Sequence, residues 1–240
     1  MAIRAISFDF WHTLFTEQPG GFKLYQETRR RRLRQAAGDR FTDDQLERAR
    51  LLEAEAHHHI WIDEHRTLPA IERVRKIFDH LGVFPLDGVM DELAHAFEEG
   101  LLERPPVLIE GVRETLEHLA GRYRLGIISD VGFSPGRVLK KVLDQEGLLD
   151  LFDSLVFSDE AGRAKPHREV FELTSRSLEA HPSEIVHIGD LEHTDIVGAK
   201  KAGYRAIRFS GITPIDEEKG TIADRVTADF TEVPRLIESL

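Results

Sequence analysis

Five short apolar segments recur along the chain, and most of them end in a polar or acidic residue. They are Ile3–Phe8, Tyr123–Asp130, Ser154–Ser158, Glu184–Asp190 and Tyr204–Phe209. Segments of this length that are apolar nearly throughout are typical of buried strands rather than helices. A strand without polar alternation has both faces covered, which is the usual situation in a parallel sheet.

Helical periodicity fills the intervals between these segments. Apolar residues return every three or four positions in Gly111–Ala120, Pro135–Gln145, Val170–Leu178 and Ile196–Ala202. Strands that alternate with helices in this way predict an α/β fold. We expect a doubly wound parallel sheet with helices on both faces.

Residues 17–104 depart from this alternation and contain no convincing strand. Four helices are predicted there: Phe22–Ala37, a helix from Thr42 to about Asp63, one from Pro69 to Gly82, and Leu86–Gly100. Thr42 and Gln45 form a capping-box signature, and Gly82 suits the end of a helix. We therefore expect a sheet core made of residues 1–16 and 105–240, with an all-helical domain inserted at residues 17–104.

Composition narrows the functional classes. The 240-residue chain has a formal net charge of −11, which argues against non-specific binding to nucleic acid or to acidic membranes. It has no cysteine, which excludes disulfides, thiolate metal sites and a cysteine nucleophile. The N-terminal segment lacks the pattern of a signal peptide, and no apolar run approaches the ~20 residues that span a bilayer. We expect a cytoplasmic protein that acts on a small molecule, and the sequence predicts no oligomeric state.

Polar side chains with catalytic potential follow the predicted strands. Asp9 ends the first strand, Ser129 and Asp130 end the second, and Asp190 ends the fourth. Ligands of doubly wound sheets bind beyond the carboxyl ends of the strands, so these residues are expected to share one site. Lys165 follows the third strand in a loop, and Asp195 stands five residues after Asp190.

These residue types suit phosphoryl transfer. A carboxylate such as Asp9 can attack as a covalent nucleophile and form an aspartyl-phosphate. Placed together, Asp9 and Asp190 would repel each other, and a Mg²⁺ ion between them removes that conflict. Ser129 can donate a hydrogen bond to phosphate oxygens, and Lys165 can neutralise charge on the nucleophile and on the phosphoryl group.

Four ordered motifs together resemble those of the haloacid dehalogenase-like superfamily. They are FDFWHTLF at residues 8–15, with Asp9 and Thr13; IISD, with Ser129; GRAKP, with Lys165; and IGDLEHTD, with Asp190 and Asp195. The similarity covers the whole chain. The helical insertion lies where this family carries its helical cap of the first type, and the resemblance implies a Rossmann-like core.

The resemblance also implies a magnesium site. Asp9 would be both the nucleophile and a metal ligand, and Trp11 would offer only its backbone carbonyl to the metal. Asp190 would bind the metal directly, and Asp195 would support it through water or from a second layer. Lys165 would orient Asp9.

The resemblance implies a magnesium-dependent hydrolase, a phosphatase that acts on a small phosphorylated metabolite through an aspartyl-phosphate intermediate at Asp9. The phosphate would be held by Ser129 and by the main chain at Asp130.

Trp11 is a departure from the phosphatase pattern. Phosphatases of this superfamily usually have a second aspartate there as the general acid, and an indole has no proton to exchange at neutral pH. General acid–base help contributes ~10²–10⁴-fold, so its loss corresponds to roughly 3–5 kcal/mol of barrier. His12 is adjacent and titrates near neutrality, which makes it a possible substitute.

Two alternatives remain open at this stage. Metal-independent 2-haloacid dehalogenases also lack the second aspartate, because halide leaves without a proton. The dense acidic cluster of Asp190, Glu192 and Asp195 suits a cation better than the carboxylate of a haloacid, so the phosphatase interpretation is favoured. The third hypothesis is a catalytically weak binding or regulatory member of the superfamily.

Two further clusters lie in the helical insertion. The run Arg29–Arg32 is interpreted as a solvated helix face, with a cationic rim for a phosphorylated substrate as the alternative. The run His57–His59 is interpreted as helix surface or as a face that lines a cleft. Only His59 and Asp63 have the four-residue spacing of helical metal ligands, and two ligands alone make a weak site.

Overall fold

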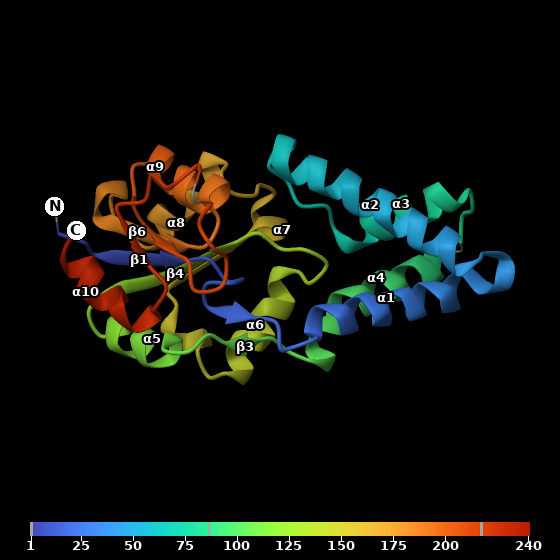
Figure 1. Cartoon of the computed structure of the whole chain (residues 1–240), viewed down its shortest axis with the longest axis horizontal. Coiled ribbons are helices and arrows are strands. Elements are labelled where there is room, and N and C mark those ends of the chain that lie inside the picture. The colour runs from blue at the N-terminus through green and yellow to red at the C-terminus, as the bar shows by residue number, and fades with distance from the viewer. Residues whose placement is uncertain (1, 86, 217) are drawn as a thin grey trace. The chain divides into compact units, whose positions relative to one another are not determined.

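The computed structural model describes residues 2–85, 87–216 and 218–240, and the chain divides into two compact units. The first, called the core unit, comprises residues up to 16, residues 107–130 and residues from 143 onward. The second, called the helical unit, comprises residues 17–106 and 131–142. Figure 1 shows the whole chain, and each unit is described by itself below.

A six-stranded parallel sheet forms the centre of the core unit. Its strands, in spatial order, are β5 (Ser154–Phe157), β4 (Arg124–Ser129), β1 (Ala5–Phe8), β6 (Ile185–Gly189), β7 (Arg205–Phe209) and β8 (Arg225–Thr227). Every neighbouring pair is parallel. The chain builds outward from β1 on one side and then returns to build outward on the other. This is the doubly wound order, and it confirms the predicted α/β fold.

The central strand β1 is buried along its whole length. Phe8 is opposite Ile127 of β4 on one side and Ile188 of β6 on the other. The carboxyl ends of the three strands therefore lie near one another, and the residues that follow β1 and β6 emerge side by side. This register is what positions the candidate site.

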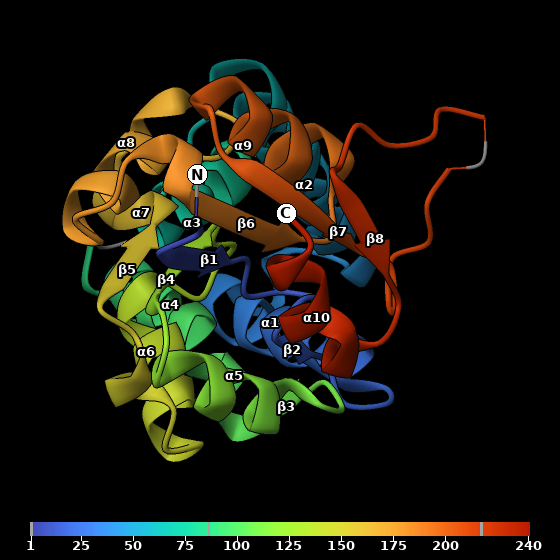
Figure 2. The ribbon, with the colours of Figure 1, turned by 90° about the vertical axis from the view of Figure 1, so that its left-hand side faces the viewer.

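Helices cover both faces of the sheet (Figure 2). On one face lie α8 (Arg168–Ser177) and α9 (Val197–Ala202), and on the other lie α5 (Val112–Ala120) and α10 (Val233–Glu238). Their apolar stripes match those seen in the sequence: Val112, Leu116 and Leu119 of α5 are buried completely. Phe171 of α8 is also buried completely, and it belongs to the cluster that packs beneath β6 and β7.

Several short elements were absent from the sequence prediction. They are β8, the helix α10, the four-residue helix α7 (Ser158–Ala161), and an antiparallel ribbon of β2 (Phe15–Thr16) with β3 (Val107–Leu108). Each of these strands has two or three residues, so no periodicity can be recognised. The remaining turns are the 3₁₀ segments η1 (Gly38–Arg40), η2 (Gly100–Glu103), η3 (Leu149–Leu151), η4 (Pro182–Glu184) and η6 (Phe230–Glu232), and the π-helical segment η5 (Glu192–Ile196).

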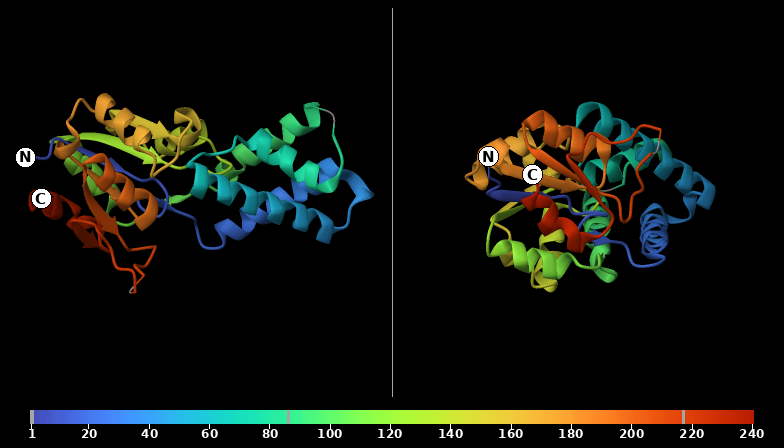
Figure 3. Two further views of the ribbon diagram at one scale, coloured as in Figure 1. Left: turned by 90° about the horizontal axis from the view of Figure 1, so that it is seen from above. Right: turned by 60° about the vertical axis from the view of Figure 1, so that its left-hand side comes forward.

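Four helices from residues 17–106 of the helical unit lie side by side (Figure 3): α1 (Gly21–Ala37), α2 (Asp43–Glu64), α3 (Ala70–Leu81) and α4 (Asp87–Glu99). The capping box of Thr42 and Gln45 is confirmed, as is the left-handed Gly82 that ends α3. The described residues 17–85 and 87–106 contain no strand. The predicted fourth helix began at Leu86, which lies outside the described residues.

The segment 131–142 packs with the helical unit, although its sequence position lies within the predicted core. It includes the start of α6 (Gly136–Gln145). The Phe133 ring meets Phe97 edge to face at 5.2 Å, and Arg137 forms ion pairs with Glu98 and Glu99. These contacts join residues far apart in sequence, so no local pattern indicates them. Among the described helices, none is both long and apolar enough to cross a bilayer.

Candidate active site

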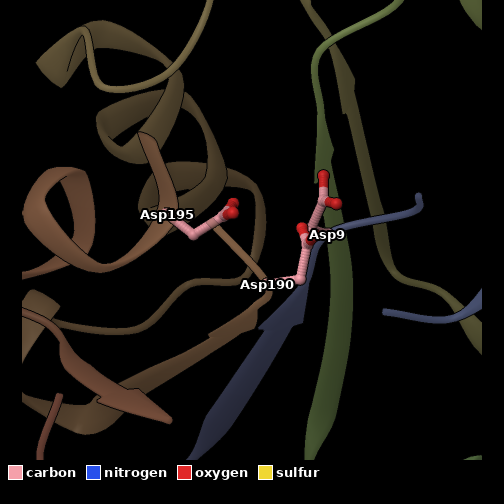
Figure 4. A group of neighbouring side chains, drawn as sticks. All are labelled: Asp9, Asp190 and Asp195. Carbon is pink, nitrogen blue, oxygen red and sulfur yellow. The ribbon is translucent and has the colours of Figure 1, made fainter. Parts of the chain in front are cut away.

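Three carboxylates converge at the carboxyl end of the sheet. Asp9 follows β1 and Asp190 follows β6, and the backbone N–H of Asp9 donates to the carbonyl oxygen of Ile188 at 2.8 Å. One carboxylate oxygen from each of Asp9, Asp190 and Asp195 lies within 4.8 Å of the others. Figure 4 shows Asp9 and Asp190 at the ends of their strands and Asp195 on the helical segment beside them. The parallel register thus brings together residues that are about 180 positions apart in sequence.

Lys165 is the cation that faces this cluster. Its side chain is 2% exposed, and Nζ donates hydrogen bonds to Asp9 Oδ1, to Asp195 Oδ1 at 2.7 Å and to the carbonyl oxygen of Ile128 at 3.0 Å. An ammonium group has three donors, so all of them are used. The loop that carries Lys165 is also anchored through its main chain, because the backbone N–H of Lys165 donates to Asp130 Oδ1 at 2.9 Å.

Asp195 is fixed by donors on both of its oxygens. Oδ1 accepts hydrogen bonds from Lys165 and from His187 Nε2 at 3.1 Å, and Oδ2 accepts one from the backbone N–H of Leu191 at 2.9 Å. Its close approach to β6 depends on Gly189, because a Cβ added there would lie 2.3 Å from Asp195 Cγ. Any residue with a Cβ atom would clash at this position, so only glycine fits.

His187 was not recognised in the sequence as a site residue. It is completely buried in β6, and its Nδ1 lies 2.9 Å from Ser7 Oγ of β1. Burial lowers the pKa of His187 in spite of its hydrogen bond to Asp195, so the ring is neutral at pH 7. Because a carboxylate can only accept, Nε2 carries the proton and Ser7 donates to Nδ1. A continuous hydrogen-bonded chain therefore runs from Ser7 through His187, Asp195 and Lys165 to Asp9.

Asp190 is held from a different direction. Thr213, in the long loop after β7, donates its hydroxyl to Asp190 Oδ2. His12 Nδ1 lies 3.8 Å from the same oxygen, and His12 has a left-handed backbone with φ of 55°. Sequence reasoning missed Thr213, because this residue stands in a polar loop without any recognisable motif.

Burial and mutual repulsion set the protonation of the cluster. Burial raises the pKa of Asp9 well above its usual value, against the opposing effect of Lys165. Burial and the charge of Asp195 raise the pKa of Asp190 as well. Burial acts in the same direction on Asp195, but Lys165 and His187 hold the pKa of Asp195 below its usual range. Burial alone would lower the pKa of Lys165, but Asp195 and then Asp9 hold it above its usual value.

Two carboxylate oxygens in the cluster are left without a donor. Within the described part of the chain, Asp9 Oδ2 and Asp190 Oδ1 accept no hydrogen bond, although both residues are at least 94% buried. Buried carboxylate oxygens that lack a donor are suitable ligands for a hard divalent cation. Mg²⁺ is such a cation, and proteins usually bind it through one or two carboxylates. The donor set is therefore compatible with magnesium.

Ser129 and Trp11 stand apart from this hydrogen-bonded cluster. Ser129 ends β4, is 1% exposed, and its hydroxyl lies 3.4 Å from the carbonyl oxygen of Asp130. The Trp11 ring is partly exposed and packs edge-on against Phe10, with the ring centres 5.2 Å apart. Thr13, the fifth residue of the first motif counted from Asp9, is completely buried, and its hydroxyl has no partner among the described residues.

The histidine run of the helical unit does not gather metal ligands. His59 Nδ1 lies 3.5 Å from Asp63 Oδ2, as their spacing suggested, but both side chains are 68% exposed. Within the described residues, the only group of three metal-ligating side chains is that of Asp9, Asp190 and Asp195.

Comparisons with known proteins agree with this geometry. Residues 3–203 match the model of a family described as haloacid dehalogenase-like hydrolase. The chain is 33% identical over 135 residues to a glyceraldehyde 3-phosphate phosphatase of Pyrococcus furiosus, which covers 55% of this chain and 54% of that protein. It thus spans about half the length of this relative.

Two further similarities extend over most of the chain. A phosphorylated carbohydrates phosphatase of Thermotoga maritima is 28% identical over 206 residues, which cover 85% of this chain and 84% of that protein. The structure of a 2-haloacid dehalogenase from Pseudomonas syringae pv. Tomato DC3000 superposes with a TM-score of 0.76 at 24% identity, with 99% of each chain covered. At that identity the similarity shows the fold alone. The family match, the sheet order and the four motifs establish that this chain is a member of the haloacid dehalogenase-like hydrolase family.

Proposed function

We propose that this protein is a magnesium-dependent phosphatase that acts on a small phosphorylated metabolite through an aspartyl-phosphate at Asp9. The observation that carries the proposal is the pairing of two buried carboxylates, Asp9 and Asp190, each with one oxygen that accepts no hydrogen bond, beside the buried cation Lys165. The relatives named as phosphatases support it.

The metal would be held by Asp9 Oδ2 and Asp190 Oδ1, with the backbone carbonyl of Trp11 as a further ligand. Asp195 has a supporting position in this proposal, because its oxygens already accept hydrogen bonds from Lys165, His187 and Leu191. When bound, magnesium would neutralise charge on the phosphoryl oxygens and relieve the repulsion between the carboxylates.

The protein's own groups account for the covalent step. A carboxylate oxygen of Asp9 forms a bond to phosphorus, and the bond from phosphorus to the ester oxygen breaks, so that the leaving group departs with the electron pair and takes its proton from solvent, while Asp9 carries the phosphoryl group. Lys165 holds Asp9 Oδ1 in place and favours the ionised form of the attacking group against the effect of burial. Ser129 and the main chain at Asp130 would receive the phosphoryl oxygens. Water then releases inorganic phosphate and restores Asp9.

The dehalogenase alternative receives less support from the site. The structural similarity to a 2-haloacid dehalogenase concerns the fold, which both chemistries share. A metal-free site for a haloacid must attract a carboxylate, but Asp9, Asp190 and Asp195 present three acidic groups around a single lysine. The same excess of negative charge is what a divalent cation would compensate.

Phosphatase activity and the role of Asp9 can be tested together. With p-nitrophenyl phosphate, hydrolysis should require Mg²⁺ and should disappear on chelation with EDTA. The Asp9→Asn variant should lose on the order of 10³-fold or more in turnover, because the nucleophile is removed, and should form no base-labile phosphoenzyme. Asp39→Asn, which changes an exposed residue of the helical unit, serves as the control and should behave as the wild type.

Other results would favour the alternatives. Chloride release from 2-chloropropionate without any divalent cation would favour the dehalogenase. Absence of turnover across a broad panel of phosphate esters and haloacids, with Mg²⁺ binding retained, would favour a binding or regulatory protein. Full activity of Asp9→Asn would eliminate the covalent mechanism.

A further inference from the structure

A cationic cluster lies inside the helical unit, apart from the carboxylates described above. Arg29 of α1 and Arg73 of α3 both place their guanidinium groups over the ring of Phe133, at 4.6 Å and 3.6 Å from the ring centre. All three residues belong to the helical unit. Attraction by the ring face helps to hold the two cations in place but supplies no net negative charge.

The neighbouring acidic groups do not balance Arg29. Arg73 and Glu53 form a two-pronged ion pair, with Nε to Oε1 at 2.6 Å and Nη2 to Oε2 at 3.2 Å. Arg50 is paired in the same way with Glu47. Arg29 has neither a hydrogen bond nor an ion pair with any residue in the described ranges. The cluster therefore has one guanidinium in excess of its carboxylates.

Arg29 is also partly removed from water. Its side chain is partly buried, whereas the next two arginines of the run, Arg30 and Arg31, are exposed. Burial, followed by repulsion from Arg73, lowers the pKa of Arg29 to about 10. A guanidinium that has lost part of its hydration without gaining a counter-ion is costly, and structures seldom retain one without a ligand.

A second unpartnered group lies on the neighbouring helix. His57 stands four residues after Glu53 on α2, so the two side chains share a helix face. Its Nδ1 atom is buried and has no hydrogen-bond partner among the described residues. Burial and the charge of Arg73 lower the pKa of His57 to about 3, so the ring is neutral and can donate through Nδ1. Arg73 Nη1 likewise makes no hydrogen bond within the described chain.

We propose that the helical unit contains a binding site for an oxyanion, either a carboxylate or a phosphate group, centred on Arg29 with Arg73 and His57 as further donors. Guanidinium groups match both kinds of oxyanion with paired hydrogen bonds. A bound anion would balance the positive charge of Arg29, because Glu53 is already paired with Arg73. The site rests only on contacts within the helical unit and holds independently of the proposed phosphatase activity.

Malonate, a small dicarboxylate, is the probe for this site. In the absence of Mg²⁺ the acidic cluster around Asp9 disfavours anions, so malonate should not bind there. Titration calorimetry on the full chain should show that malonate binds to the wild type, and Arg29→Gln should raise its dissociation constant at least tenfold. Arg30→Gln, an exposed position on the same helix, is the matched control and should bind as the wild type.

Thermal unfolding separates binding from a structural role of Arg29. Without malonate, Arg29→Gln should melt at the same temperature as the wild type or higher, since it removes an unpaired charge. With malonate, only the wild type and Arg30→Gln should gain stability. A lower melting temperature of Arg29→Gln without malonate, together with unchanged affinity, would assign Arg29 to packing. Failure of the wild type to bind malonate would also overturn the proposal.

A titration with inorganic phosphate identifies the kind of oxyanion that the site takes. Tighter binding of malonate than of phosphate to the wild type would assign a carboxylate, and tighter binding of phosphate would assign a phosphate group. Arg29→Gln should weaken the binding of whichever anion is preferred, and equal affinity of this variant and the wild type for both anions would overturn the proposal. Neither titration needs turnover, so neither depends on the outcome for Asp9→Asn.

Discussion

Trp11 decides how the chemistry of Asp9 can be used. It stands two residues after Asp9, the proposed nucleophile, and its indole cannot protonate a leaving group. The structure places its ring against Phe10 and places the neighbouring His12 beside Asp190. Esters whose leaving group needs no acid are therefore expected to be the better substrates.

Trp11→Asp tests this limit at the level of one residue. An aspartate there would restore a general acid, so hydrolysis of an alkyl phosphate with a poor leaving group should rise, by up to ~10²–10⁴-fold. Hydrolysis of p-nitrophenyl phosphate should change little, because nitrophenolate leaves without a proton. Trp11→Phe, which restores no acid, is the control for altered packing. If the alkyl phosphate shows no gain with Trp11→Asp, the indole shapes the substrate pocket instead.

At the scale of elements, the pairing of helices α2 and α3 depends on a buried ion pair. Glu53 of α2 is 1% exposed and Arg73 of α3 is 6% exposed, and they are joined by two hydrogen bonds. The surrounding helix contacts are apolar, from a cluster that includes Leu46, Val74 and Ile77. The ion pair thus joins the two helices within an apolar surrounding, and the apolar cluster supplies most of the stability.

Removal of one partner should therefore destabilise the helical unit. Glu53→Gln leaves the charge of Arg73 without its carboxylate, and such changes cost roughly 3–5 kcal/mol. Urea denaturation followed by circular dichroism should show the loss. Glu55→Gln, at an exposed position of the same helix, should cost less than about 0.5 kcal/mol. Equal stability of the two variants would contradict a structural role for the pair.

At the scale of the whole molecule, the proposed metal site would couple stability to metal concentration and to pH. In the metal-free protein, burial raises the pKa of Asp9 and the pKa of Asp190. A bound divalent cation needs both groups ionised, so protons compete with it. The competition begins at a higher pH than for free carboxyl groups, whose pKa is about 4.

Magnesium should therefore raise the melting temperature in a pH-dependent manner. At neutral pH and a concentration of 100 times Kd, the stabilisation is about 2.7 kcal/mol. It should diminish as the pH falls through the raised pKa values of Asp9 and Asp190, and should be lost before the pH reaches about 4. Thermal scans with and without Mg²⁺ across this range measure the effect. Asp190→Asn should abolish the shift at every pH, and a shift that persisted in this variant would place the cation elsewhere.

Local patterns were sufficient for the framework of the fold. The continuous apolar runs that became β1, β4, β5, β6 and β7 were recognised because a buried parallel strand is apolar on both faces. The order of strands and helices then led to the prediction that Asp9 and Asp190 lie at one edge of the sheet, and they do. The capping box of Thr42 was equally readable, because its partner is three residues away.

The sequence by itself thus determined the parallel sheet, the helical insertion and the acidic residues at the strand ends, since these follow from periodicity and from neighbours along the chain. Only the tertiary structure decided which oxygens of those carboxylates have donors, that Ser7 and His187 support Asp195, and that Thr213 reaches Asp190. It also separated Arg29 from the exposed arginines beside it. The reason is physical: a hydrogen bond or a buried charge depends on side chains from distant segments, and their juxtaposition exists only after the strands and helices have packed.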